Sequence, residues 1–225
     1  MLACVDREIF GVGDGQNDDR AYRRHIMNNM ATYPYTAIFD YDQDLDRIRV
    51  YNARRSPASR TRLQIQMGAA PYDGDPHTAR VILLLNNPVY TPGVSKPTDH
   101  LLAYAGWPLA GLHPDAPSAF RLWYQRPLGR LISDYGAQHV SKRVCLLQLC
   151  PWASQAFDLA LVLPSRSHQI ELAHAAVQRG AVVIAGRSFG AWPAGLPRVR
   201  NRLNPTLTPN GLDEGTWNRV EKALG

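Results

Sequence analysis

The sequence has few cysteines and no long apolar run. Cys4, Cys145 and Cys150 are the only cysteines in 225 residues, and the last two sit in an apolar stretch typical of buried thiols. This usage favours a reducing, cytoplasmic setting. No apolar run reaches the roughly 20 residues that a membrane helix needs. The N-terminus has two acids and no long apolar region, so no signal peptide is predicted.

Motifs for several common chemistries are also missing. The glycine-rich stretch at 11–16 follows no clear strand and lacks the spacing of phosphate-binding loops. The alternating acids at 40–46 lack the glycine and glutamate of a calcium loop, so a solvated acidic turn is expected. The seven histidines are dispersed, and no GxSxG nucleophile motif occurs. No metal and no cofactor is therefore predicted.

Positive charge is present in excess. Arginine dominates a formal net charge of +6, and the sequence pI is about 9.4. A basic surface of this size is compatible with a phosphate-bearing partner such as DNA. It is equally compatible with a protein that is merely soluble and basic, so composition alone leaves both interpretations open.

Structure is hard to read in the first 60 or so residues. A short helix is expected over 20–30, and two short strands around the acidic turn are expected within 35–54. A turn-rich segment at 71–79 then leads into the more regular part of the chain.

Buried strands alternate with helices after this point. Three apolar runs predict buried strands at Arg80–Leu85, Arg143–Leu149 and Ala181–Ala185. A short fourth strand is expected at Arg198–Arg202. Helices are expected at Ser118–Gln138, with a kink or break at Pro127, at Ser167–Gly180, capped by Ser167 and ended by Gly180, and at the C-terminus. The pattern predicts an α/β fold whose central four-stranded sheet is largely parallel and has helices on both faces. The chain is interpreted as a single domain, 1–225, with an N-terminal extension to about residue 65 and a core over about 66–225.

Polar or aromatic residues follow each predicted strand. The four segments are Asn86–Tyr90, Cys150–Ser154, Gly186–Gly190 and Asn204–Thr208. Ligands of open parallel sheets bind beyond the carboxyl ends of the strands, so these segments are expected to share one rim. The rim would hold amides, hydroxyls, an arginine and aromatics but no carboxylate, which argues against a two-carboxylate glycosidase.

The residues on this rim resemble the uracil-DNA glycosylase superfamily, nearest to its mismatch-specific uracil and thymine-DNA glycosylase branch. The first motif of that branch reads Gly-Ile-Asn-Pro-Gly, and this chain has Leu85-Asn86-Asn87-Pro88-Val89. The second reads like Asn-Pro-Ser-Gly-Leu, and this chain has Asn204-Pro205-Thr206-Leu207. The chain departs from the superfamily at Val89, which replaces a glycine, and at the additional Asn86. It also lacks the aspartate and histidine that other branches carry in these motifs.

The resemblance implies a three-layer α/β/α sandwich and a glycosylase that hydrolyses the N-glycosidic bond of a base flipped out of DNA. Asn87 would position the water, and Asn204 would stabilise negative charge on the leaving base. Substrate-binding residues would be Asn86, Pro88, Tyr90, Trp152, Ser154, Pro205 and Thr206, with Tyr90 or Trp152 stacking on the base. Residues for backbone phosphate would be Arg187, Ser188, Arg200 and Arg202.

Each of these residues also has a purely structural interpretation. Asn87 before Pro88 is typical of a turn that follows a strand, and Trp152 is compatible with a core position. Two further functions therefore stay open: a catalytically inactive relative that binds nucleic acid or a nucleotide, and a small-molecule hydrolase.

Overall fold

The computed structural model describes residues 40–93, 106–185, 187–203 and 206–225; the side chains of residues 119, 120, 187 and 188 are outside the description. Contacts within the chain define two units, 1–36 and 37–225, and everything below concerns the second. The helix expected over 20–30 and the glycine-rich stretch at 11–16 lie outside the described residues.

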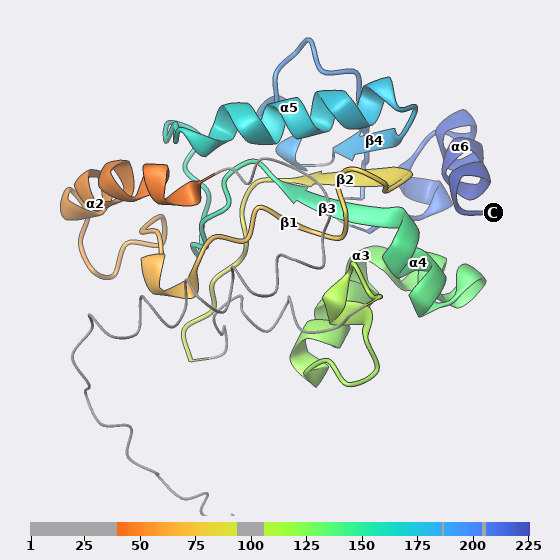
Figure 1. Ribbon diagram of the computed structural model, residues 1–225, viewed down its shortest axis with the longest axis horizontal. Helices are drawn as coiled ribbons and strands as arrows, with labels where there is room; N and C mark the ends of the chain where they lie inside the picture. The colour runs from red at the N-terminus through yellow and green to blue at the C-terminus, as the bar shows by residue number, and fades with distance from the viewer. Residues whose placement is uncertain (1–39, 94–105, 186, 204–205) are drawn as a thin grey trace, which may run out of the picture. The chain divides into compact units, whose positions relative to one another are not determined.

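A five-stranded mixed sheet forms the centre of this unit (Figure 1). In spatial order its strands are β1 (Tyr72–Asp73), β3 (Val144–Gln148), β2 (Val81–Leu85), β4 (Val182–Ala185) and β5 (Val199–Arg200). The last four are parallel, whereas β1 is antiparallel to β3. The four predicted strands are confirmed, although β5 is only two residues long. The two-residue β1 was missed because it lies in a turn-rich segment without an apolar run.

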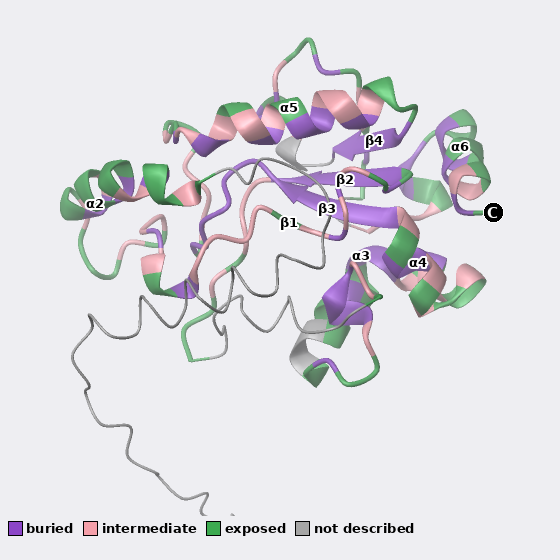
Figure 2. Cartoon of the chain, in the orientation of Figure 1, coloured by how far each residue is buried: buried purple, intermediate pink, exposed green. Residues whose placement is uncertain are grey.

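Helices cover both faces of the sheet, so the α/β class is confirmed. They are α3 (Ser118–Tyr135), α4 (Ala137–Arg143) and α6 (Glu214–Leu224) on one face and α5 (Ser165–Gln178) on the other. A further helix, α2 (Leu45–Ala53), packs in a separate cluster. Alternate residues of β2 point to opposite faces: Leu83 packs with α3, α4 and α6, and Leu84 packs with α5. Figure 2 shows the result, because β2, β3 and β4 are buried while the outer helix surfaces are exposed.

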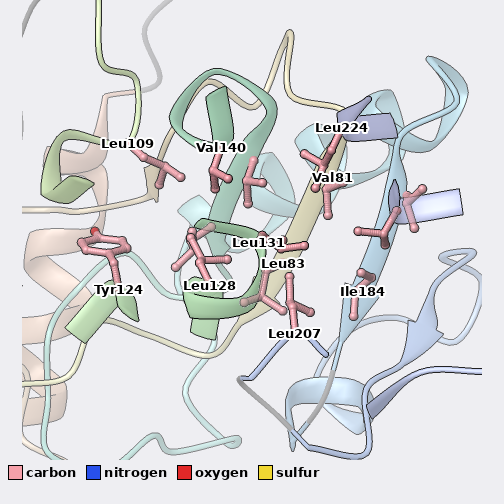
Figure 3. Close-up of a cluster of buried hydrophobic side chains, with 14 of the residues drawn as sticks. Val81, Leu83, Leu109, Tyr124, Leu128, Leu131, Val140, Ile184, Leu207 and Leu224 are labelled. Carbon is pink, nitrogen blue, oxygen red and sulfur yellow. The ribbon is translucent and has the colours of Figure 1, made fainter. Parts of the chain in front are cut away.

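The cluster beneath α3 also includes a residue from the loop after β5. Leu207 is fully buried there beside Leu83, Leu128 and Ile184 (Figure 3). Its backbone N–H donates to the carbonyl of Pro127 over 2.8 Å. Pro127 does not split α3, which runs through it to Tyr135.

Helix α5 differs from its prediction at one end. It begins at Ser165 rather than Ser167, and the Ser167 hydroxyl donates to the carbonyl of Pro164, so the expected cap at Ser167 is wrong. At the other end Gly180 has a φ of 81° and its N–H donates to Val177, as expected of a glycine that ends a helix.

The acidic segment forms helix rather than the two strands that were expected. A short 3-10 helix at Tyr41–Asp44 continues into α2, and Asp40 caps it by accepting from the N–H of Asp42. Alternating acids suggested a solvated turn, but Asp44 is fully buried. Its carboxylate accepts from Trp152 Nε1 at 2.8 Å and from the Ser165 N–H at 2.9 Å.

This Asp44 contact holds α2 against the core. Around it, Ile48, Leu63, Cys150 and Leu163 form a third apolar cluster with Trp152. Burial raises the pKa of the Cys150 thiol to about 12 and that of Cys145 well above its usual value, so both stay protonated. Among the described residues, no helix is both long and apolar enough to cross a membrane.

We expect Asp44→Ala to lower the free energy of unfolding by about 2–4 kcal/mol, because it leaves the Trp152 and Ser165 N–H groups buried without an acceptor. Asp46→Ala is the matched control: Asp46 is exposed and only pairs with Arg49, so its loss should cost under about 0.5 kcal/mol. Urea unfolding measures both. Equal losses in the two variants would contradict the role given to Asp44.

Candidate functional site

The segments after β2 and β3 continue to pair once the strands have ended. The N–H of Cys150 donates to the carbonyl of Asn86 at 2.8 Å, and the N–H of Ser154 donates to that of Pro88 at 3.2 Å. The N–H of Tyr90 in turn donates to the carbonyl of Ser154 at 3.0 Å. Two of the predicted rim segments are therefore fixed side by side by backbone hydrogen bonds.

Asn87 is held in one orientation by this arrangement. Its Nδ2 donates to Ser154 Oγ at 2.8 Å and to the carbonyl of Pro88 at 3.0 Å. A carbonyl can only accept, so the amide nitrogen, and not the oxygen, must face Pro88. Both N–H groups of Asn87 are then used, and its Oδ1 accepts from no group in the described part of the chain. Asn87 thus stabilises the turn through its Nδ2, and its Oδ1 remains available as a hydrogen-bond acceptor.

Ser154 positions Asn87 rather than a ligand. Only 2% of the residue is exposed. Its hydroxyl accepts from Asn87 and donates to the carbonyl of Ala156 at 2.8 Å. Because both interactions are internal, the Ser154 hydroxyl supports Asn87 and is not offered to a substrate, although a substrate contact was predicted for it.

Two further side-chain amide oxygens at the strand ends have no hydrogen-bond donor among the described residues. Asn86 Oδ1 and Gln148 Oε1 are buried and accept no hydrogen bond from the described residues. Gln148 lies directly opposite Leu85 in the parallel register, and opposed residues project to the same face. A buried, unpartnered amide oxygen costs about 1–3 kcal/mol. Its presence at a strand end favours a binding role.

The sequence did not indicate Gln148 as a binding residue, because it lies inside an apolar run that predicts a buried strand. The only signal was a glutamine in a segment otherwise expected to be wholly buried.

The turn after β5 brings the fourth segment toward α3. Asn201 is buried; it donates to the carbonyl of Thr206 at 3.1 Å and accepts from the N–H of Leu203 at 2.9 Å. The N–H of Thr206 donates to the carbonyl of Leu203 at 2.8 Å. Thr206 thus takes part in this turn through its backbone N–H and carbonyl groups. The predicted Asn204 and Pro205 lie outside the described residues.

The two aromatic candidates have different environments. Trp152 is 3% exposed and its indole N–H is used by Asp44, so it belongs to the core and is not offered to a base. Tyr90 is half-buried on the paired segment after β2. Of the two predicted stacking residues, only Tyr90 is partly exposed.

The predicted phosphate-binding arginines are partly placed. Arg200 and Arg202 are exposed, at the end of β5 and just beyond it. The backbone of Arg187 and Ser188 lies in a short 3-10 helix, Arg187–Gly190, after β4, and their side chains are outside the description.

Arg198 has a structural role that the sequence did not reveal. Its guanidinium donates to the carbonyls of Phe189, Trp192, Pro193 and Leu196, and it stacks on the Phe189 ring at 4.3 Å. It holds the connection between β4 and β5.

A carboxyl group lies near the site although the sequence predicted none there. Asp73 in β1 is opposite Leu146, two residues before Gln148 in β3, so it projects to the same face as Gln148. Burial raises the pKa of Asp73 to about 7, although hydrogen bonds from the N–H groups of Ala110 and Gly74 favour its ionised form. Within the described ranges, no group of three or more histidine, cysteine, aspartate or glutamate residues is arranged to hold a metal ion.

Searches of protein-family models, curated proteins and solved structures returned no match to this chain. The interpretation of the site therefore depends on its geometry and on the motif resemblance.

The raised pKa of Asp73 predicts a pH dependence of stability. The folded state keeps this proton up to about pH 7, whereas an unfolded aspartate loses it near pH 4. Stability contributed by Asp73 is therefore present at about pH 4 and is lost as pH rises toward 7. Urea unfolding at several pH values should show a smaller decline over this window in Asp73→Asn. The idea fails if the difference between wild type and variant stays constant from pH 4 to 8.

Proposed function

We propose that the chain is a divergent uracil-DNA glycosylase-like protein that hydrolyses the N-glycosidic bond of uracil or another damaged base flipped out of DNA. Four parallel strands with helices packed on both faces support the corresponding three-layer α/β/α sandwich. The buried thiols Cys145 and Cys150 suit a cytoplasmic location, which is part of the proposal.

The observation that carries the proposal is the fixed amide of Asn87. Its two N–H groups are bound by Ser154 and Pro88, which leaves Oδ1 as a hydrogen-bond acceptor without a donor among the described residues. A water held by this oxygen is restrained before it attacks C1′ of the sugar. Restraint of this kind lowers the barrier by removing positional freedom and needs no strong base.

The reaction balances without a cofactor. The water oxygen bonds to C1′ as the C1′–N bond breaks, and the bonding electrons leave with the base. The proton released by the water ends on the base. Negative charge develops on the base during this step, so hydrogen-bond donors aimed at the base stabilise the transition state. By resemblance, Asn204 is such a donor.

Gln148 gives the site a means of reading a base. An amide presents one donor and one acceptor side by side, which matches the N3–H and O4 edge of uracil. Gln148 Oε1 is buried without a partner among the described residues. A base that donates its N3–H to this oxygen therefore forms a hydrogen bond shielded from water. A site built this way rejects ligands that leave the amide unpaired.

The second candidate, a protein that binds nucleic acid or a nucleotide without hydrolysis, is favoured by one observation. In the described part of the chain Asn87 contacts Ser154 and Pro88 but no carboxylate. No carboxylate is therefore hydrogen-bonded to the residue that would hold the attacking water, and hydrolysis would depend mainly on positioning. Exposed Arg200 and Arg202 serve either function by binding phosphate.

Oligonucleotides that carry uracil, a G·U or G·T mismatch, or hypoxanthine test the proposal. Each is incubated with the protein and then treated with alkali, which cleaves the strand at an abasic site. We expect cleavage on at least one substrate and a rate about 100-fold lower in Asn87→Ala, because the water is no longer positioned. Ser154→Ala should lower the rate about 5-fold, since it removes one anchor of Asn87 worth about 1 kcal/mol.

Asn218→Ala is the matched control, because Asn218 is exposed in α6. It should leave the rate unchanged, and thermal unfolding should show that all three variants are folded. Absence of cleavage on every substrate, with salt-sensitive DNA binding retained, would rule out the glycosylase and leave the binding protein.

A further inference from the structure

One flank of α3 carries an exposed tryptophan and exposed arginines. Trp123 is 40% exposed, and it is the most exposed tryptophan in the described part of the chain. Trp152, Trp192 and Trp217 are each 6% exposed or less. Burying an indole normally stabilises a protein, so an exposed one on a helix that packs against the sheet calls for a partner.

The helical repeat places this flank on the side of α3 that contacts Leu207. Trp123 and Arg130 lie four residues before and three after Pro127, so the three share one stripe of α3. The carbonyl of Pro127 accepts the N–H of Leu207. The stripe that holds Trp123 therefore includes the residue whose carbonyl contacts Leu207, in the loop after β5.

The indole of Trp123 rests on a fixed support. Its ring meets the Tyr124 ring edge to face, with centroids 4.8 Å apart and planes at 82°. Tyr124 is itself buried against Gly111, where a Cβ atom would lie 1.9 Å from the tyrosine ring. A preordered aromatic ring loses little freedom when a ligand stacks on it.

The charge around Trp123 is positive. Arg126, three residues further on and on the same side, is exposed and makes no hydrogen bond or ion pair with the described residues. Arg130 is also exposed, although it pairs with Asp134 at 2.7 Å. An exposed ring beside free positive charge matches the bases and phosphates of a single strand. It does not suit a duplex, whose base faces are covered by their neighbours.

We propose that this surface, formed by Trp123, Arg126 and Arg130, binds single-stranded DNA next to the candidate site. A base stacks on Trp123, and Arg126 contacts a phosphate. The inference rests on the proposed function, because it gives the strand state of the same substrate. It places an unpaired segment of the strand along α3 while one nucleotide reaches Asn87.

Tryptophan fluorescence tests the proposal directly. An oligothymidylate of about 12 nucleotides should quench the emission of the wild-type protein, because stacking brings a base onto its most exposed indole. Trp123→Ala should lower the affinity roughly 5- to 100-fold and remove most of the quenching. Trp123→Phe should restore much of the affinity, since it keeps a stacking ring. A single-stranded abasic oligomer should bind weakly and quench little.

The control variant is Gln125→Ala. Gln125 is exposed two residues from Trp123 and therefore lies on the opposite side of α3. It should bind like wild type. Arg126→Gln should reduce the slope of log K against log salt by about 0.7, which is the loss of one phosphate contact on a single strand.

The outcomes separate this inference from the glycosylase. Asn87→Ala should keep the binding and quenching while it loses base release. Equal affinity for the duplex and the single strand, or wild-type binding in Trp123→Ala, would overturn the stacking surface whether or not bases are released. Lack of base release with Trp123-dependent quenching would overturn only the glycosylase.

Discussion

The candidate site depends on backbone pairing between the chain segments that leave β2 and β3. This pairing continues from Cys150 and Asn86 to Ser154 and Tyr90, well after both strands have ended. It brings the Ser154 hydroxyl within 2.8 Å of the Asn87 amide. A side-chain amide that would otherwise rotate is thereby fixed, and its oxygen remains for a ligand. The hydrogen bond from Trp152 to Asp44 also stabilises the segment 150–154.

Some polar groups around the site hold the loops in place, and others have atoms that remain available to a ligand. Asn201 and Ser154 are satisfied by internal partners and hold the loops in place. Arg198 does the same through its two terminal guanidinium nitrogens. Asn86 and Gln148 have buried oxygens without partners in the described part of the chain. Since unpartnered buried polar atoms are costly, the residues that retain them are the ones most informative about a ligand.

Much of the parallel sheet could be predicted from sequence because its strands are short, continuous apolar runs. Val81–Leu85 and Val144–Gln148 are fully buried, and this burial is what their composition indicated. Asp44 shows the limit of such reasoning. Its acidic neighbours suggested solvent, but the carboxylate is buried by an indole N–H that lies 108 residues further along the chain. No local pattern encodes that contact.

The candidate site was also only partly predictable. The order of the polar segments indicated a shared rim, and the pairing of residues 86–90 with 150–154 agrees with that for two of them. Trp152 could not be assigned to the core without knowing its partner. Gln148 and Asp73 could not be found at all, because their importance comes from the register of β3 with its two neighbours.

The central proposal is that Asn87 and Gln148 contact the same ligand. Side-chain amide resonances in a ¹⁵N–¹H correlation spectrum test it during titration with 2′-deoxyuridine 5′-monophosphate. We expect the Asn87 and Gln148 amides to shift together and to saturate with a single dissociation constant. The amides of Asn52, which bonds within the α2 region, and of exposed Asn218 should stay unchanged. No shift at Asn87 and Gln148, or shifts confined to Asn52 and Asn218, would contradict the account.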